Sequence, residues 1–122
     1  MDVYQDTGNP DLAAVRRAMK LDDAEELKTL IVGLALYHED GRVVEELCHR
    51  LSGHADEFVR GNAVLGFGHL ARRFRTLDER ALAIVERALK DSSDHVRGQA
   101  WAAAGDVCFF LGWKVSGVTP EA

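Results

Sequence analysis

The 122-residue sequence contains few of the residues that break or cross-link small folds. It has two prolines and two cysteines, and aromatic residues make up 7% of the chain. Because 47% of the residues are hydrophobic, a chain of this length can bury a core without disulfide bonds. Cys48 and Cys108 lie within apolar helical patterns. We therefore expect both to be buried free thiols in a reducing compartment.

Segments that direct a protein out of the cell or into a membrane are also missing from the pattern. The first six residues contain no basic group and no apolar run, so we expect no secretory signal. No stretch approaches the roughly 20 apolar residues that a membrane-spanning helix needs. The expected location is the cytoplasm, without membrane contact.

Positive charge is scarce in the first half of the chain. Residues 1–58 contain six Lys or Arg and 13 Asp or Glu, whereas residues 59–122 contain nine and seven. Phosphate groups are attracted by the opposite field, so nucleic acid is not an expected partner, whereas a basic protein would be drawn to the acidic half. A solvated helical surface explains the same charges equally well.

Residues that start and stop helices recur along the whole chain, and apolar residues return between them at helical spacing. The expected starts are at Asn9-Pro10-Asp11, Asp22 with Glu25, Asp56, Thr76 with Glu79, and Ser93, and the expected stops include Ser52-Gly53 and Gly112. No segment alternates as strands do. The sequence therefore predicts one all-α domain over 1–122, with helix pairs at about 10–38, 41–74 and 77–112 and a tail at 113–122.

The strongest pattern is an internal repeat with an offset of 37 residues. The segment Val59-Arg60-Gly61-Asn62-Ala63 returns as Val96-Arg97-Gly98-Gln99-Ala100, and Gly68 and Gly105 match further along. A repeat of this length with two helices is typical of solenoids, in which each helix pair leaves one face uncovered until its neighbour stacks on it. We therefore predict a short right-handed α-solenoid of three helix pairs.

The run from Leu89 to Ala100 resembles the HEAT repeat, whose second helix typically begins with an acidic loop followed by Val-Arg and a small residue. The resemblance covers two of the three predicted helix pairs. In that family aspartate and arginine commonly form a ladder between stacked repeats. The resemblance implies this structural role for Asp56, Arg60, Asp91, Asp94 and Arg97. His54 takes the place of Asp91 one repeat earlier, which leaves open whether the ladder is interrupted there.

Candidate catalytic and metal-binding residues are sparse. His38-Glu39 resembles the pairs with which HEAT-like deoxyhypusine hydroxylases hold iron, but that site needs several such pairs and this chain has one. Cys48, His49 and His54 lack the fourth ligand of a structural zinc site. We therefore expect a protein that is not an enzyme and that takes no cofactor, metal or small-molecule substrate.

Solenoids bind partners along the surface made by one helix of each pair. The residues predicted to form this binding face are Asp22, Glu25, Glu26, Asn62, His69, Arg73, Gln99, Asp106 and Phe110. Trp101 is expected to cap the core at the last repeat. Phe110 and Trp113 belong either to that cap or to an exposed anchor for a partner.

A short, acidic, all-helical chain that consists of a binding scaffold resembles the immunity proteins of bacterial contact-dependent and polymorphic toxin systems. Several of those families are small α-helical solenoids. The resemblance implies that the chain neutralises a cognate toxin by direct binding, with a basic toxin domain as the partner. The alternative is a general HEAT-like adaptor or regulatory scaffold. A HEAT-like lyase or hydroxylase is more distant.

Overall fold

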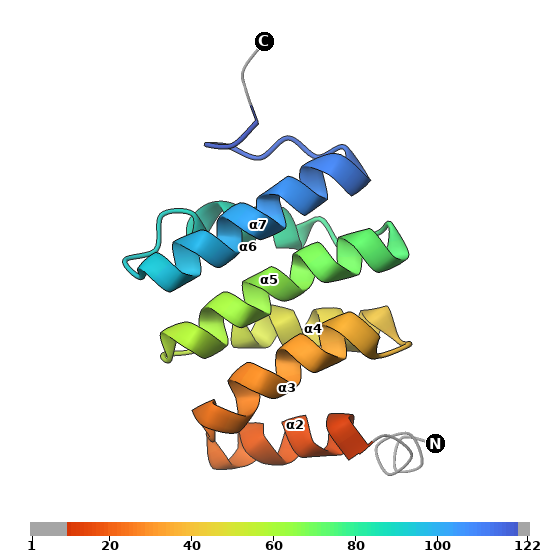
Figure 1. Cartoon of the computed structure of the whole chain (residues 1–122), viewed down its shortest axis with the longest axis vertical. Helices are drawn as coiled ribbons and strands as arrows, with labels where there is room; N and C mark the ends of the chain where they lie inside the picture. The colour runs from red at the N-terminus through yellow and green to blue at the C-terminus, as the bar shows by residue number, and fades with distance from the viewer. Residues whose placement is uncertain (1–9, 120–122) are drawn as a thin grey trace.

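The computed structural model describes residues 10–119, which fold into helices joined by short loops (Figure 1). The helices are α2 (Pro10–Leu21), α3 (Ala24–Tyr37), α4 (Gly41–Leu51), α5 (Glu57–Phe74), α6 (Arg80–Ala88) and α7 (Asp94–Leu111). No strand occurs in this range, and the prediction of an all-α fold is confirmed. The expected cap at Asn9 and the last three residues of the tail lie outside the described residues.

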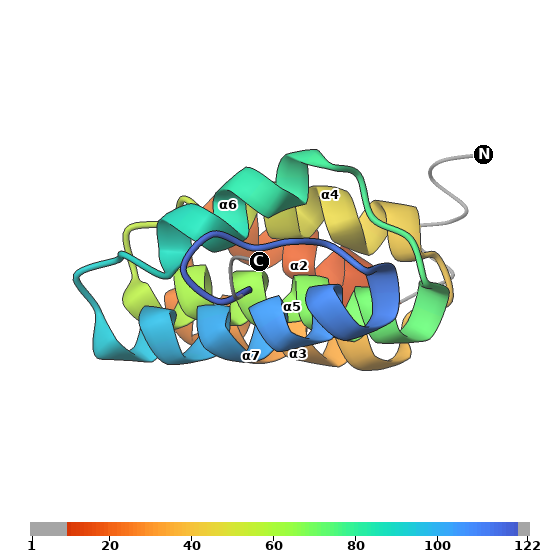
Figure 2. The ribbon, with the colours of Figure 1, turned by 90° about the horizontal axis from the view of Figure 1, so that it is seen from above.

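The helices are arranged as pairs that stack on one another. α3, α5 and α7 lie side by side and run in the same direction, while α4 and α6 lie behind them (Figures 1 and 2). α5 is the central helix, because it packs against α3, α4, α6 and α7. α2 packs on α3 at the N-terminal end of the stack. None of the described helices is long and apolar enough to cross a membrane.

The core follows the apolar positions that the repeat predicts. Val59, Ala63, Phe67 and Leu70 of α5 are buried. Their counterparts on α7 are also buried, at Val96, Ala100, Ala104 and Val107. Both helices therefore present to the core the faces that their apolar spacing indicates.

Two predicted helix starts and two predicted stops are confirmed. Ser52 is the C-cap of α4, as the predicted stop at Ser52-Gly53 requires. The side chains of Asp56 and Ser93 accept hydrogen bonds from N–H groups in the first turns of α5 and α7. Gly112 ends α7 in the left-handed conformation, with φ of 69°. These ends depend on residues close together in the chain, which is why the local pattern indicates them.

Two other predicted starts are wrong. Asp23 caps α3 in place of Asp22, because Asp22 has a φ of 50° and lies in the turn between α2 and α3. α6 begins at Arg80, whose N–H donates to the side chain of Asp78, so Thr76 is not the cap. The N-cap of α3 therefore lies one residue beyond the predicted one, and the N-cap position of α6 is Glu79, whose side chain makes no capping hydrogen bond.

The segment after α7 covers the end of the core (Figure 2). Val115 is buried, and Trp113 and Val118 pack against the core. Trp113 therefore belongs to the cap. Trp101 is 61% exposed, and its prediction as a cap is wrong, because the tail leaves this part of α7 uncovered.

Both cysteines are free thiols. Cys48 is buried, as predicted, against the backbone of Gly66. Cys108 is only half-buried, and its Sγ lies 3.3 Å from the hydroxyl oxygen of Thr119.

Candidate protein-binding face

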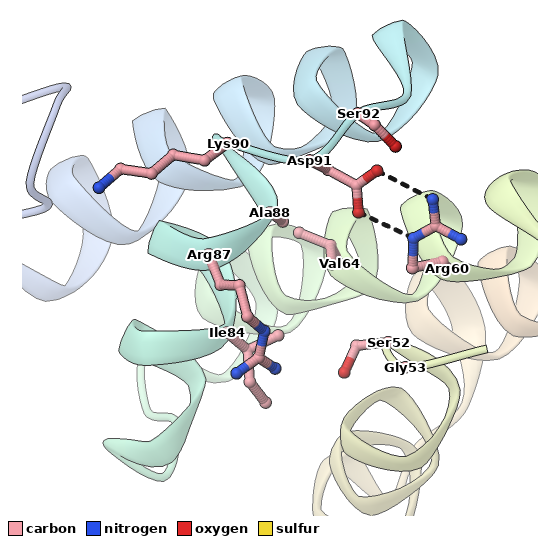
Figure 3. Close-up of a pocket in the computed structure, with 10 residues that line it drawn as sticks. All are labelled: Ser52, Gly53, Arg60, Val64, Ile84, Arg87, Ala88, Lys90, Asp91 and Ser92. Carbon is pink, nitrogen blue, oxygen red and sulfur yellow. Dashed lines mark hydrogen bonds and ion pairs between the residues drawn. The ribbon is translucent and has the colours of Figure 1, made fainter. Parts of the chain in front are cut away.

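An ion pair between Arg60 and Asp91 links the second helix pair to the third. Arg60 donates from Nε and Nη2 to the two carboxylate oxygens of Asp91, at 2.8 and 2.9 Å (Figure 3). The hydrogen bonds from Arg60, with one from the backbone N–H of Ser93, lower the pKa of Asp91 to about 2. These two predicted ladder residues therefore join neighbouring repeats.

Arg97 keeps its contacts within its own repeat. It pairs with Asp94 one helical turn away, and its Nη1 donates to the backbone carbonyl of Asp91 at 2.7 Å. Arg60 donates in the same way to the carbonyl of His54, at 3.1 Å. Each arginine thus holds the loop that precedes its helix, and only Arg60 also reaches the next repeat.

His54 connects the second helix pair to the first through a contact of a different kind. It takes the position of Asp91 one repeat earlier, and its Nε2 lies 2.7 Å from Oδ1 of Asp22 in the first helix pair. Its Nδ1 accepts the backbone N–H of Asp56, just as the Asp91 carboxylate accepts that of Ser93. The connection between pairs is therefore present, with the acidic and basic partners exchanged.

The central residues of the predicted binding face form bridges between the parallel helices. Asn62 on α5 donates to the carbonyl of Lys28 on α3 at 2.9 Å, and its Oδ1 accepts from Gln99 on α7 at 2.8 Å. His95 Nε2 lies 3.1 Å from the same oxygen atom. These contacts connect α3, α5 and α7 through one asparagine.

Arg73 also ties α5 to α3. It donates to the backbone carbonyls of Ala35 and His38 at the end of α3, at 2.8 and 2.7 Å. Phe110 occupies the equivalent position on α7 and is partly exposed, with the Arg75 guanidinium 4.8 Å from its ring centroid. Both predicted binding residues therefore combine an inter-helix contact with a solvent-facing side.

His69 and Asp106 are repeat equivalents, and both are half-buried. Burial and the neighbouring Arg72 lower the pKa of His69, although the charge of Asp106 opposes this shift. The lowered pKa favours the neutral imidazole of His69, whose Nδ1 lies 3.1 Å from Nη2 of Arg72. His69 and Asp106 together therefore introduce no net positive charge at the centre of the predicted binding face.

Asp22, Glu25 and Glu26 are exposed around the start of α3. Because α3, α5 and α7 run in the same direction, their first turns lie along one edge of the molecule (Figure 1). That edge also includes Glu57 of α5 and Asp94 of α7. We call Glu25, Glu26, Glu57 and Asp94 the acidic edge. Acidic first turns are favoured by the helix dipole, which is the structural reason for this placement.

Exposed aromatic residues lie on α3 and α5 as well as on α7, and those on α3 and α5 were not predicted from the sequence. Tyr37 and Phe109 are 81% and 80% exposed, and Phe58 is also exposed. Phe58 contacts the ring of His95, with centroids 4.8 Å apart, and lies below the ammonium group of Lys28. Phe58 therefore belongs to the same α3–α5–α7 surface. Phe58 is the counterpart of His95 at the repeat offset of 37 residues, and this correspondence could have identified Phe58 from the sequence.

No known protein family, curated protein or solved structure matches this chain.

The candidate zinc ligands are not brought together. Cys48 is buried, and this burial, with the nearby charge of Glu45, raises the pKa of its thiol well above the usual range. His49 Nε2 lies 3.3 Å from Glu45, and His54 contacts Asp22. Within residues 10–119, no group of three or more His, Cys, Asp or Glu side chains could hold a metal ion.

A cleft of about 360 Å³ lies beside the Arg60–Asp91 pair, between the ends of α4 and α6 (Figure 3). Val64, Ile84 and Ala88 provide its apolar lining. The charged pair at its side is already satisfied internally. The cleft is a gap between stacked helix pairs.

Proposed function

We propose that this chain is a protein-binding module, and specifically an immunity protein that neutralises a cognate bacterial toxin by direct binding. The observation that carries the proposal is the bridged α3–α5–α7 face. Asn62 joins all three helices, and Arg73 holds the end of α3 to α5. A surface held in this way loses little conformational freedom when a partner binds, so more of the contact energy contributes to affinity.

The charge of this face supports a basic partner. The acidic edge lies beside the exposed ring of Phe58, which follows Glu57 in the first turn of α5. Exposed carboxylates attract a basic domain during encounter, whereas an aromatic ring contributes to holding the complex together. A basic toxin domain could contact both the carboxylates and the ring, because Glu57 and Phe58 are neighbours in the first turn of α5.

The stacked helix pairs also support the resemblance to HEAT repeats. A right-handed solenoid with an aspartate–arginine ladder is the architecture that this resemblance implies, and the Arg60–Asp91 pair fits it. Proteins built in this way present one helix of each pair to their partners. In this chain the helices presented by the three pairs are α3, α5 and α7.

The test is to co-express the chain with the product of the adjoining gene, purify the complex and measure the affinity by isothermal titration calorimetry. The immunity function requires a stable complex and loss of the toxin's activity. Phe58→Ala should weaken binding at least about tenfold, because apolar anchors dominate interface energy. Arg87→Ala, on α6 away from the face, is the control and should leave the affinity unchanged.

Three outcomes decide between the candidates. Absence of a complex would exclude that product as the partner and would contradict the immunity proposal. A complex whose partner has no toxic activity would favour the adaptor alternative. A complex weakened by Arg87→Ala but not by Phe58→Ala would place the binding surface on the α4–α6 side.

A further inference from the structure

One side of α7 is apolar and exposed along most of its length. Gly98, Trp101, Ala102, Gly105 and Phe109 are all exposed, and they recur every three or four residues. This spacing places them on one face of the helix. None of the five residues carries a charge, and the nearest charged residue on this side of the helix is Asp94, one turn before Gly98 and paired with Arg97. We call these five residues the α7 face.

The internal repeat indicates what kind of surface the α7 face is. Gly61 and Gly68 on α5 are the equivalents of Gly98 and Gly105, and α7 covers them closely. A Cβ atom at either α5 glycine would lie 2.7 Å from an α7 side chain, so these glycines allow the two helices to approach. A Cβ atom at Gly98 or Gly105 would meet no atom of another described segment within 4 Å. Among residues 10–119, α7 thus repeats a helix-receiving surface on which no helix packs.

The segment after α7 covers a different part of the core. The N–H of Ser116 donates to Glu86 of α6 at 2.7 Å, and Val115 is buried. The tail therefore runs over the seam between α6 and α7 (Figure 2). Trp101 and Phe109 stay 61% and 80% exposed with the tail in place.

We propose that the α7 face binds the α7 face of a second copy of this chain. The two helices pack antiparallel about a two-fold axis between Trp101 and Ala102. This axis places Gly98 opposite the partner's Gly105, and Trp101 opposite the partner's Ala102. A two-fold contact requires a face that is complementary to itself, and an uncharged face of glycine, alanine and aromatic residues meets this requirement without like-charge repulsion.

The opposite end of the stack disfavours head-to-tail assembly. α2 forms that end, and its exposed residues include Arg16, Arg17 and Lys20. Stacking the α7 face on α2 would remove these charged groups from water against apolar side chains, which is costly. The contact therefore joins two α7 faces and closes at a dimer.

The size of the face sets the strength of the dimer. A fully buried aromatic side chain contributes about 150–250 Å². Because Trp101 and Phe109 are 61% and 80% exposed, each copy would bury roughly 200–350 Å² through these two rings. The rings of both copies together would bury roughly 400–700 Å², and the small residues between them raise the total to at most roughly 1,000 Å², which is typical of weak interfaces. We therefore expect a dimer whose dissociation constant is in the micromolar range.

Sedimentation equilibrium from low micromolar to submillimolar concentration tests the dimer. The average mass should rise from that of the monomer toward twice that value. Trp101→Ser and Phe109→Ser should each raise the dissociation constant at least about tenfold. Tyr37→Ser is the matched control, because Tyr37 is as exposed as Phe109 but lies at the end of α3. Circular dichroism should show unchanged folding, since these rings contribute little to the core.

A cysteine cross-link tests the position of the axis. Ala102→Cys should give a covalent dimer under mild oxidation, because the two copies of residue 102 lie next to the axis. Lys20→Cys on α2, and the unmodified chain with Cys48 and Cys108, should not. A monomer at every concentration, a dimer unaffected by both serine variants, or a cross-link through Lys20→Cys would each overturn the proposal. None of these outcomes bears on toxin binding, which is tested separately.

Discussion

At the scale of single residues, the equivalent repeat positions 54 and 91 both connect neighbouring helix pairs, but they do so with different side chains. Asp91 receives two hydrogen bonds from Arg60, whereas His54 at the equivalent position contacts Asp22. Both side chains also accept a backbone N–H two residues further along. The position therefore needs a side chain that can accept from its own loop and pair with the preceding repeat. An aspartate that accepts from an arginine and a histidine that donates to an aspartate both meet this need.

The Arg60–Asp91 pair makes a prediction about stability and pH. Asp91→Asn should lower the free energy of unfolding by about 1–2 kcal/mol at neutral pH, because it weakens a partly buried charged pair. The pKa of Asp91 is about 2 in the folded chain and 3.8 ordinarily, so its contribution is complete above about pH 5 and is lost as the pH falls through 3.8 toward 2. Urea unfolding followed by circular dichroism at several pH values measures this.

The control for that experiment is Asp94→Asn. Asp94 pairs with Arg97 on the surface, with its side chain 94% exposed, so its removal should cost less than about 0.5 kcal/mol. Equal losses for the two variants would contradict the role given to Asp91. A difference between Asp91→Asn and the unmodified chain that persists at pH 2 would also contradict it.

At the scale of the helices, α5 contains glycine at the positions where α4 and α7 approach it closely. Gly61 and Gly68 lie against α7, and a Cβ at Gly66 would lie 2.6 Å from Cys48 Sγ on α4. Glycine in a helix interior costs about 1 kcal/mol relative to alanine. Close packing of α5 on both sides offsets this cost, which explains why glycines cluster in the central helix.

Gly68 and Gly105 are repeat equivalents with opposite predictions. Gly68→Ala should destabilise the fold by about 1–3 kcal/mol, because its Cβ would lie 3.1 Å from the backbone of Ala103 as well as close to Asp106. Gly105→Ala should stabilise it by about 0.5–1 kcal/mol, because the site is open and alanine favours helix. Thermal melts at low micromolar concentration, where the monomer dominates, compare the two. Shifts of the same sign would show that α7 does not pack on α5 through this face.

At the scale of the whole molecule, the common direction of α3, α5 and α7 gathers their acidic first turns at one edge. The opposite end of α5 carries Arg72, Arg73 and Arg75. α5 is therefore electrically asymmetric along its length, with Glu57 in its first turn and arginines at its end. An approaching basic domain would be oriented by this asymmetry before contact.

The asymmetry predicts how a basic partner associates. Replacing Glu25, Glu26 and Glu57 together by glutamine should slow association about three- to tenfold at low salt, and less at high salt, because exposed charges act mainly on encounter. This set leaves Asp22 in place, since Asp22 pairs with His54. Surface-plasmon kinetics at two salt concentrations provide the measurement, with Glu39→Gln beyond the end of α3 as the control. An association rate indifferent to both salt and the triple substitution would remove the support for a basic partner.

Much of the fold could be predicted from the sequence because its determinants are local. Helix periodicity places Val59, Ala63 and Phe67 on one side of α5 whatever lies beyond them. Asp56 and Ser93 cap helices through N–H groups within three residues. The repeat then transfers each assignment to its counterpart 37 residues away. The starts of α3 and α6 were misplaced because several acidic residues compete there, and the turn geometry selects among them.

The candidate site depended far more on the tertiary structure. The sequence could place Asn62 and Gln99 on helices, but their contacts join residues more than 30 positions apart and depend on how closely the helices pack. The same holds for His54, whose partner Asp22 is set by the stacking of one helix pair on another. The exposure of Trp101 was decided by the path of the tail. Periodicity identifies a helix face, but only the packed neighbours determine whether that face meets the core, another helix or water.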